Sequence, residues 1–132
     1  MSKSILLLDD SEDELFVTKY MIKNFKYFDH IYTSKDGHEV LDQLNSYLNH
    51  PNSIDHYPPS VLLLDINMPL MDGFEFLDKY HQCLNEHPEQ PSMKIAMMSS
   101  SKKNEDIERS REYKQVIDFI FKPLTIKKFK AN

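Results

Sequence analysis

Five short apolar runs, separated by longer amphipathic segments, are the feature that most constrains the fold of this chain. The runs consist mainly of continuous apolar or β-branched residues, and polar residues do not alternate with them. This pattern is typical of strands in a parallel sheet, where helices cover both faces. We therefore predict strands at residues 4–8, 31–33, 61–64, 95–98 and 116–121.

The first two intervening segments have apolar residues at helical spacing. The first opens with Ser11 and Glu14, which match the S-x-x-E capping box of a helix N-terminus. Its predicted apolar stripe comprises Phe16, Val17, Tyr20, Met21 and Phe25. In the second segment Asp36 is the expected N-cap, with Glu39 three residues later. Its predicted apolar face comprises Val40, Leu41, Leu44, Tyr47 and Leu48.

Three further helices are predicted at residues 73–83, at residues 104–112 and from about Thr125 onward. Strands that alternate with helices form a parallel sheet with right-handed crossovers, so the predicted fold class is α/β with a doubly wound five-stranded sheet. A chain of 132 residues suits one domain. The polar, proline-rich loops 49–59 and 85–93 are predicted to be surface insertions within it.

Composition excludes several classes of protein. The formal charge of -5, from 21 acidic and 16 basic side chains, disfavours direct binding of nucleic acid, which depends on Lys and Arg. The sequence contains no apolar run of the ~20 residues that a membrane helix needs, so membrane insertion is not expected. The single cysteine, Cys83, leaves no internal disulfide to form. Together these features predict a cytoplasmic protein.

Polar and charged residues stand at the carboxyl ends of four predicted strands: Asp9, Asp10, Asp65, Ser99 and Lys122. Each taken singly could be a helix cap or a turn residue. In a parallel sheet, however, these ends meet at one edge, where ligands bind. Clustered carboxylates need a cation, and oxygen ligands with few carboxylates favour Mg²⁺ together with a phosphate group. We therefore predict a phosphoryl site.

The chemistry follows from the residue types at this edge. A carboxylate held at a strand end, such as Asp65, can attack phosphorus and form an acyl phosphate. Lys122 can supply a compact positive charge to the phosphate, and the hydroxyl of Ser99 can donate to one of its oxygens. We choose Ser99 over Ser100 because it is the first polar residue after the apolar run at 95–98.

Four motifs stand at these strand ends: LLLDD, LLLDINMPLMDG, AMMSS and FIFKP. In this order they resemble the receiver domain of two-component response regulators, of the stand-alone, chemotaxis-regulator type. The resemblance covers residues 1–132 and implies a flavodoxin-like receiver fold with strand order 2-1-3-4-5. It also shows a departure, because only a short segment is left for the last helix, which is predicted to be truncated.

The resemblance implies a role for each site residue. Asp65 is the expected phosphoacceptor, Ser99 the switch hydroxyl and Lys122 the phosphate-binding lysine, with a cis bond between Lys122 and Pro123. Phe119 is either an aromatic switch or a permanent part of the core. The implied Mg²⁺ ligands are Asp10, Asp65, the backbone carbonyl of Asn67 and, through water, Asp9.

The function implied is that of a phosphoacceptor regulator in a phosphorelay. A sensor histidine kinase or a histidine phosphotransfer protein would donate the phosphoryl group, and the signal would pass to a downstream protein by direct contact. Such a protein catalyses only its own phosphorylation and dephosphorylation. Two alternatives are an Mg²⁺-dependent aspartyl-phosphate phosphohydrolase and a scaffold that is never phosphorylated. Asn67 argues against the hydrolase, because that class carries an acid two residues after its nucleophile.

Overall fold

Five strands and four helices alternate along residues 3–50, 58–101 and 103–125, the part of the chain that the computed structural model describes. The strands are β1 (Ser4–Leu8), β2 (His30–Ser34), β3 (Val61–Asp65), β4 (Lys94–Ser99) and β5 (Val116–Phe121). The helices are α1 (Glu12–Phe25), α2 (Gly37–Asn49), α3 (Gly73–Glu86) and α4 (Asn104–Ser110). The predicted α/β alternation is confirmed.

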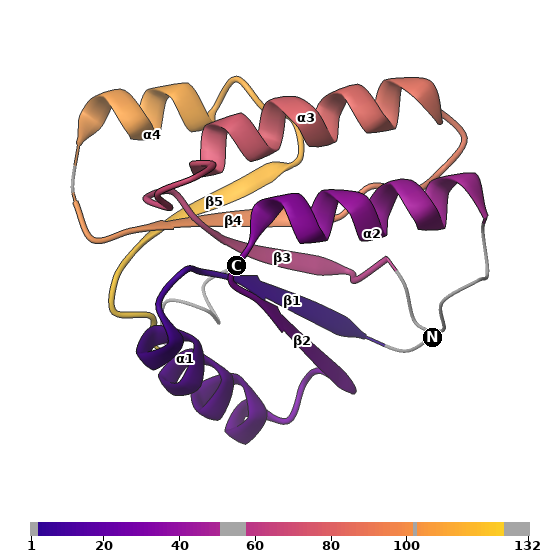
Figure 1. Cartoon of the computed structure of the whole chain (residues 1–132). Helices are drawn as coiled ribbons and strands as arrows, with labels where there is room; N and C mark the ends of the chain where they lie inside the picture. Colours follow the sequence, from indigo (N-terminus) through magenta and orange to yellow (C-terminus); the bar gives the residue numbers. More distant parts are fainter. Residues whose placement is uncertain (1–2, 51–57, 102, 126–132) are drawn as a thin grey trace.

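All strand pairs are parallel, and the order across the sheet is β2-β1-β3-β4-β5. Figure 1 shows α2, α3 and α4 on one face of the sheet and α1 on the other. The chain therefore moves outward from β1 to β2 and then returns past β1 to β3, which makes the gap between β1 and β3 the point where the winding direction reverses. In such sheets ligands bind beyond the carboxyl ends of the strands at this point.

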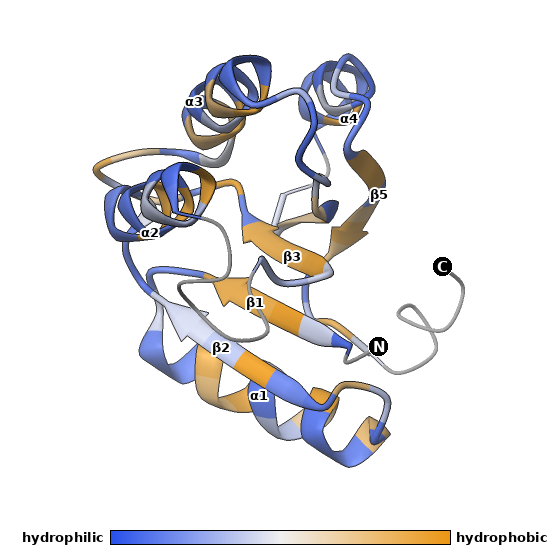
Figure 2. Cartoon of the chain, turned by 90° about the vertical axis from the view of Figure 1, so that its right-hand side faces the viewer, coloured by the Kyte–Doolittle hydropathy of each residue, from blue (hydrophilic) through white to orange (hydrophobic). Residues whose placement is uncertain are grey.

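Both faces of the central strands are buried, which explains their continuous apolar sequence (Figure 2). Successive side chains of a strand point to opposite faces. Leu6 and Leu64 accordingly join the larger core cluster beneath α2 and α3, whereas Ile5, Leu7 and Leu63 join the smaller cluster beneath α1.

The helix α2 buries the predicted face completely. Its apolar residues are all at most 8% exposed: Val40, Leu41, Leu44, Tyr47 and Leu48. The helix begins as predicted, since the side chain of Asp36 accepts a hydrogen bond from the backbone N–H of His38. Here the sequence carries a single apolar face, so spacing alone identifies the side that packs on the sheet.

The predicted apolar stripe of α1 is wrong for three of its residues, although Met21 packs against the smaller core cluster as predicted. Phe16, Val17 and Tyr20 are 74%, 57% and 66% exposed, whereas Leu15 and Ile22 are buried against the sheet. Apolar residues surround most of this helix, so helical spacing is compatible with more than one buried face. The connection from β1 selects the face, because it turns Leu15 toward the cluster that contains Ile5 and Leu7.

Several element ends differ from the predictions by one to three residues. Asp65 and Ser99 are the last residues of β3 and β4 and do not follow these strands. Helix α4 ends at Ser110, two residues earlier than predicted. The predicted helix after Thr125 and most of the predicted loop at 49–59 lie outside the described residues. Within the described part of the chain, every helix is too short or too polar to span a bilayer.

Candidate functional site

Three carboxylates meet beyond the carboxyl ends of β1 and β3. Asp9 and Asp65 are each only 3% exposed, and Asp10 beside them is exposed to solvent. One ligand atom from each of the three side chains can be chosen so that all lie within 4.8 Å of one another. The sequence-based expectation that these residues would converge is therefore confirmed by the geometry.

Asp65 is held rigidly at the centre of the sheet. Its strand pairs with β1 on one side and β4 on the other, and its Oδ1 accepts a hydrogen bond from the N–H of Asn67 at 3.4 Å. The chain then turns back, so that the N–H of Gly73 donates to the carbonyl of Ile66 at 2.8 Å. A Cβ at Gly73 would lie 3.0 Å from the carbonyl oxygen of Asp65 and from the Cα of Ile66, so glycine avoids a tight contact with the backbone here.

Lys122 reaches the same edge from the end of β5. Its backbone N–H donates to the carbonyl of Ser99 at 2.8 Å, and the predicted cis bond to Pro123 is present. The Lys122 Nζ lies 2.9 Å from Asp9 Oδ2 and 3.2 Å from Asp65 Oδ1, and it also donates to the carboxylate of Glu14. One ammonium thus serves three carboxylates while its side chain is only 14% exposed.

The electrostatics of the site favour a cation. Burial, and next the negative charge of Asp9, raise the pKa of Asp65 to about 6, although Lys122 opposes the shift. Burial by itself lowers the pKa of Lys122. The hydrogen bonds of Lys122 to Glu14 and Asp9, together with the charge of Asp65, outweigh this effect, so the pKa of Lys122 lies above its usual value. At neutral pH the site therefore holds an ionised Asp65 and a charged Lys122.

Oxygen donors in this arrangement suit a hard divalent cation. Lys122 is one ammonium beside three carboxylates, those of Asp9, Asp65 and Glu14, so negative charge is in excess. The solvent-exposed Asp10 adds a further carboxylate to the cluster. No nitrogen or sulfur ligand belongs to the group. Such a donor set fits Mg²⁺, which takes few carboxylates and keeps part of its water shell.

Ser99 and Phe119 lie on neighbouring strands close to this edge. Ser99 is fully buried and its Oγ accepts a hydrogen bond from the N–H of Ser101 at 3.0 Å, whereas Ser100 is exposed. Phe119 is half-buried, packs against the larger core cluster and meets the ring of Phe121 edge-on at 5.6 Å between centroids. Its partial burial is compatible with both roles considered from the sequence.

Sequence reasoning missed Glu14 as a member of this site. The S-x-x-E pattern predicts a capping box, and only half of that box is present. The N–H of Glu14 donates to Ser11 Oγ at 3.3 Å, but the Ser11 N–H donates to Asp9 Oδ1 at 3.0 Å. The Glu14 side chain pairs with Lys122, which is 108 residues away in the sequence. No pattern within the first helix could predict this partner.

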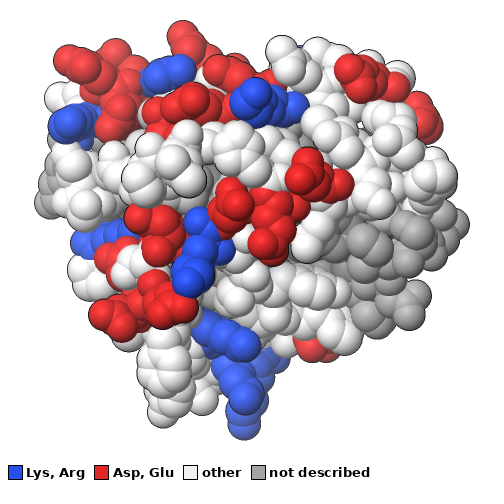
Figure 3. Space-filling model, viewed as in Figure 1, with Lys and Arg blue, Asp and Glu red and all other residues white. Residues whose placement is uncertain are grey.

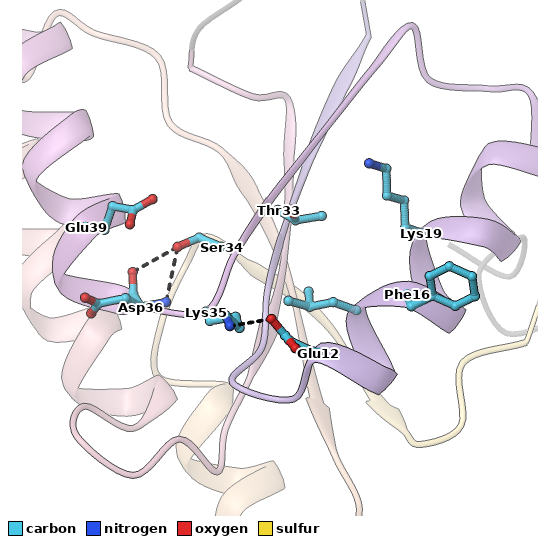
Figure 4. A pocket seen from close by; sticks show the side chains of 9 residues that line it. Glu12, Phe16, Lys19, Thr33, Ser34, Lys35, Asp36 and Glu39 are labelled. Carbon is cyan, nitrogen blue, oxygen red and sulfur yellow. Dashed lines mark hydrogen bonds and ion pairs between the residues drawn. The ribbon is translucent and has the colours of Figure 1, made fainter.

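The surface beyond the site gives further context. Figure 3 shows acidic side chains over α4, at the top left of the view, with basic ones among them. A hollow of about 530 Å³ lies between α1 and the loop after β2, where Figure 4 shows Glu12 facing Lys35. None of the clustered carboxylates lines this hollow.

The strand order and the acidic cluster at the carboxyl edge define a flavodoxin-like receiver fold. The family model of the response regulator receiver domain matches residues 5–132, and the chain belongs to this family. The structure of a two-component response regulator from Cytophaga hutchinsonii is similar to it, with a TM-score of 0.83 and 25% identity over 98% of this chain and 92% of that one.

The chain is also similar to a second solved structure and to one segment of a longer protein. The receiver domain of the histidine kinase CKI1 from Arabidopsis thaliana, solved with Mg²⁺ and BeF3-, shares the fold, with a TM-score of 0.76 and 20% identity over 98% of this chain and 91% of that one. A probable cyclic di-GMP phosphodiesterase of Vibrio cholerae serotype O1 is 26% identical over 129 residues, which are 98% of this chain and 25% of that protein. The chain thus spans about a quarter of this curated relative.

Proposed function

We propose that this receiver domain accepts a phosphoryl group on Asp65 in a two-component phosphorelay. The observation that carries the proposal is the pairing of a buried carboxylate at a strand end with two neighbouring carboxylates and one buried ammonium. A carboxylate with a pKa of about 6 is ionised at neutral pH and can act as a nucleophile. Phosphoryl transfer needs mainly positioning and charge neutralisation, which this site provides.

The donor is a phosphorylated histidine of a sensor kinase or of a phosphotransfer protein. One Asp65 oxygen forms a bond to phosphorus while the bond from phosphorus to the donor nitrogen breaks, and the imidazole leaves with that electron pair. Asp10, Asp65 and the Asn67 carbonyl, with Asp9 through water, would hold Mg²⁺, and the chemistry that the ion would supply is neutralisation of charge on the phosphoryl oxygens. Lys122 donates to one of these oxygens.

Ser99 and Phe119 convert the new charge into a changed surface. The Ser99 hydroxyl turns toward a phosphoryl oxygen, and Phe119, which now lies half-buried between the core and the groove beside α4, moves inward. The signal leaves by contact with a downstream protein. We also propose that residues 1–132 form a single receiver domain in the cytoplasm and that it catalyses only its own phosphorylation and dephosphorylation.

Intact mass spectrometry tests the assignment. The chain is incubated with Mg²⁺ and acetyl phosphate, in parallel with Asp65→Asn and with Asp42→Asn, which replaces an exposed carboxylate on α2 as a matched control. We expect one phosphoryl adduct on the parent chain and on Asp42→Asn, and none on Asp65→Asn or after chelation of Mg²⁺. An unlabelled parent chain would overturn the function, and an adduct on Asp65→Asn would overturn the choice of residue. Rapid turnover of unrelated phosphoesters would favour the hydrolase.

A further inference from the structure

The side chain of Glu14 does not take the position that its place in the helix predicts. It stands three residues after the N-cap Ser11, where a glutamate commonly returns to the N-cap N–H. In α3 the same arrangement is complete, because Asp72 and Glu75 each accept from the backbone N–H of the other. In α1 the N–H of Ser11 is already bound to Asp9 Oδ1, and the Glu14 carboxylate extends to Lys122.

The three partners of Lys122 differ in kind. An ammonium has three N–H donors, and Asp9, Asp65 and Glu14 supply one acceptor for each. Asp9 and Asp65 are nearly inaccessible and belong to the acidic cluster, whereas the side chain of Glu14 is 45% exposed and lies outside that cluster. Glu14 is thus the only one of these three partners that does not contribute to the candidate cation site.

A divalent cation would compete with the Lys122 ammonium for the negative charge of Asp9 and Asp65, whose carboxylate oxygens belong to the acidic cluster. The Glu14 carboxylate holds the Lys122 ammonium from the side of α1 and so weakens the attraction between this ammonium and the carboxylates of Asp9 and Asp65. The same carboxylate adds negative potential that favours a divalent cation. Both effects have the same sign, so removal of the charge on Glu14 weakens cation binding in two ways.

We propose that Glu14 is a positioning residue that shares the Lys122 ammonium with the acidic cluster and thereby sets the affinity of the cluster for Mg²⁺. This inference rests on the proposed phosphoacceptor function and specifies how the site is regulated. It explains why the glutamate leaves its capping position and why one ammonium lies among three carboxylates.

Glu12 provides a matched control. It lies in the same first turn of α1, and its carboxylate lies 2.7 Å from Lys35 Nζ. Figure 4 shows the two side chains facing each other. Glu14→Gln and Glu12→Gln therefore each remove one charge from the same helix turn, but only the first removes a negative charge that is paired with Lys122. Urea unfolding of both variants verifies that each chain is folded.

Isothermal titration with MgCl2 is the primary measurement. We expect Glu14→Gln to raise the Kd for Mg²⁺ by about fivefold and Glu12→Gln by less than about twofold. In a Lys122→Met background the difference between the two substitutions is expected to shrink, because the effect of Glu14 through the ammonium is lost and only its direct negative potential remains. The NMR resonance of the Lys122 ammonium without metal should shift in Glu14→Gln and stay unchanged in Glu12→Gln.

Phosphorylation by acetyl phosphate separates the two proposals. At Mg²⁺ concentrations below the Kd, Glu14→Gln should be labelled about fivefold more slowly than the parent chain, and at saturating Mg²⁺ the two rates should agree. Equal Kd values for Glu14→Gln and Glu12→Gln, or a parent chain that binds no Mg²⁺, would overturn the role of Glu14. A parent chain that binds Mg²⁺ but gains no adduct overturns the phosphoacceptor function, while the Kd comparison still decides the role of Glu14.

Discussion

Replacement of Asp65 by asparagine is expected to stabilise the metal-free fold at neutral pH. Burial and the charge of Asp9 raise the pKa of Asp65 from 3.8 to about 6, even with Lys122 at 3.2 Å. Because a tenfold change in acid dissociation corresponds to about 1.4 kcal/mol, ionisation of Asp65 costs the folded chain about 3 kcal/mol at most. An amide of the same shape carries no charge, so Asp65→Asn should be more stable by about 1–3 kcal/mol.

The pH dependence has a defined sign. The folded chain holds the Asp65 proton more tightly than the unfolded chain, so the stability from the protonated form is complete below about pH 3.8 and is lost as the pH rises through about 6. The advantage of Asp65→Asn should therefore grow from about pH 3.8 to about pH 6 and stay constant well above that. Mg²⁺ should stabilise the parent chain and reduce the difference, because it binds the folded carboxylates.

Urea unfolding followed by circular dichroism, with EDTA and then with Mg²⁺, measures this difference. Asp42→Asn, which changes an exposed carboxylate on α2, should show no comparable pH-dependent gain. Asp65→Asn could be less stable than the parent chain at pH 7 only if the ion pair between Asp65 and Lys122 stabilised the fold by more than burial of the Asp65 charge costs. That result would refute the electrostatic description of the site.

Three further substitutions test how the fold supports the site. Gly73→Ala should cost about 1–3 kcal/mol of unfolding free energy, because its Cβ would lie 3.0 Å from the carbonyl oxygen of Asp65, and an unchanged urea midpoint would contradict this. Phe76→Ala should cost about 3–5 kcal/mol in the same assay, since Phe76 is fully buried, and a cost below about 1 kcal/mol would refute its place in the core. Tyr113→Phe removes the 2.7 Å hydrogen bond to Asp78 and should cost about 0.5–1.5 kcal/mol, with faster amide hydrogen exchange in α4; equal exchange rates would show that the bond does not hold this helix.

The sequence could predict the fold because its strands are buried on both faces. Runs such as LLLD at residues 62–65 contain no alternation, and in a parallel sheet every such run delivers its last residue to one edge. The convergence of Asp9, Asp65 and Lys122 therefore follows from order along the chain alone. The α2 face was also predictable, since Val40 and Leu44 lie on the one apolar side of that helix.

Tertiary structure decided the rest, because those features depend on residues that approach one another only in the folded chain. Helix α1 has apolar residues around most of its circumference, so only its docking on the sheet selects Leu15 and not Phe16 as the buried side chain. The backbone N–H of Glu14 keeps the local bond to Ser11, but the N–H of Ser11 is bound to Asp9, and the Glu14 carboxylate instead pairs with Lys122 from the far end of the chain. Local spacing can specify the position of a glutamate in a helix, but the fold determines whether its carboxylate binds a nearby backbone N–H or a distant cation.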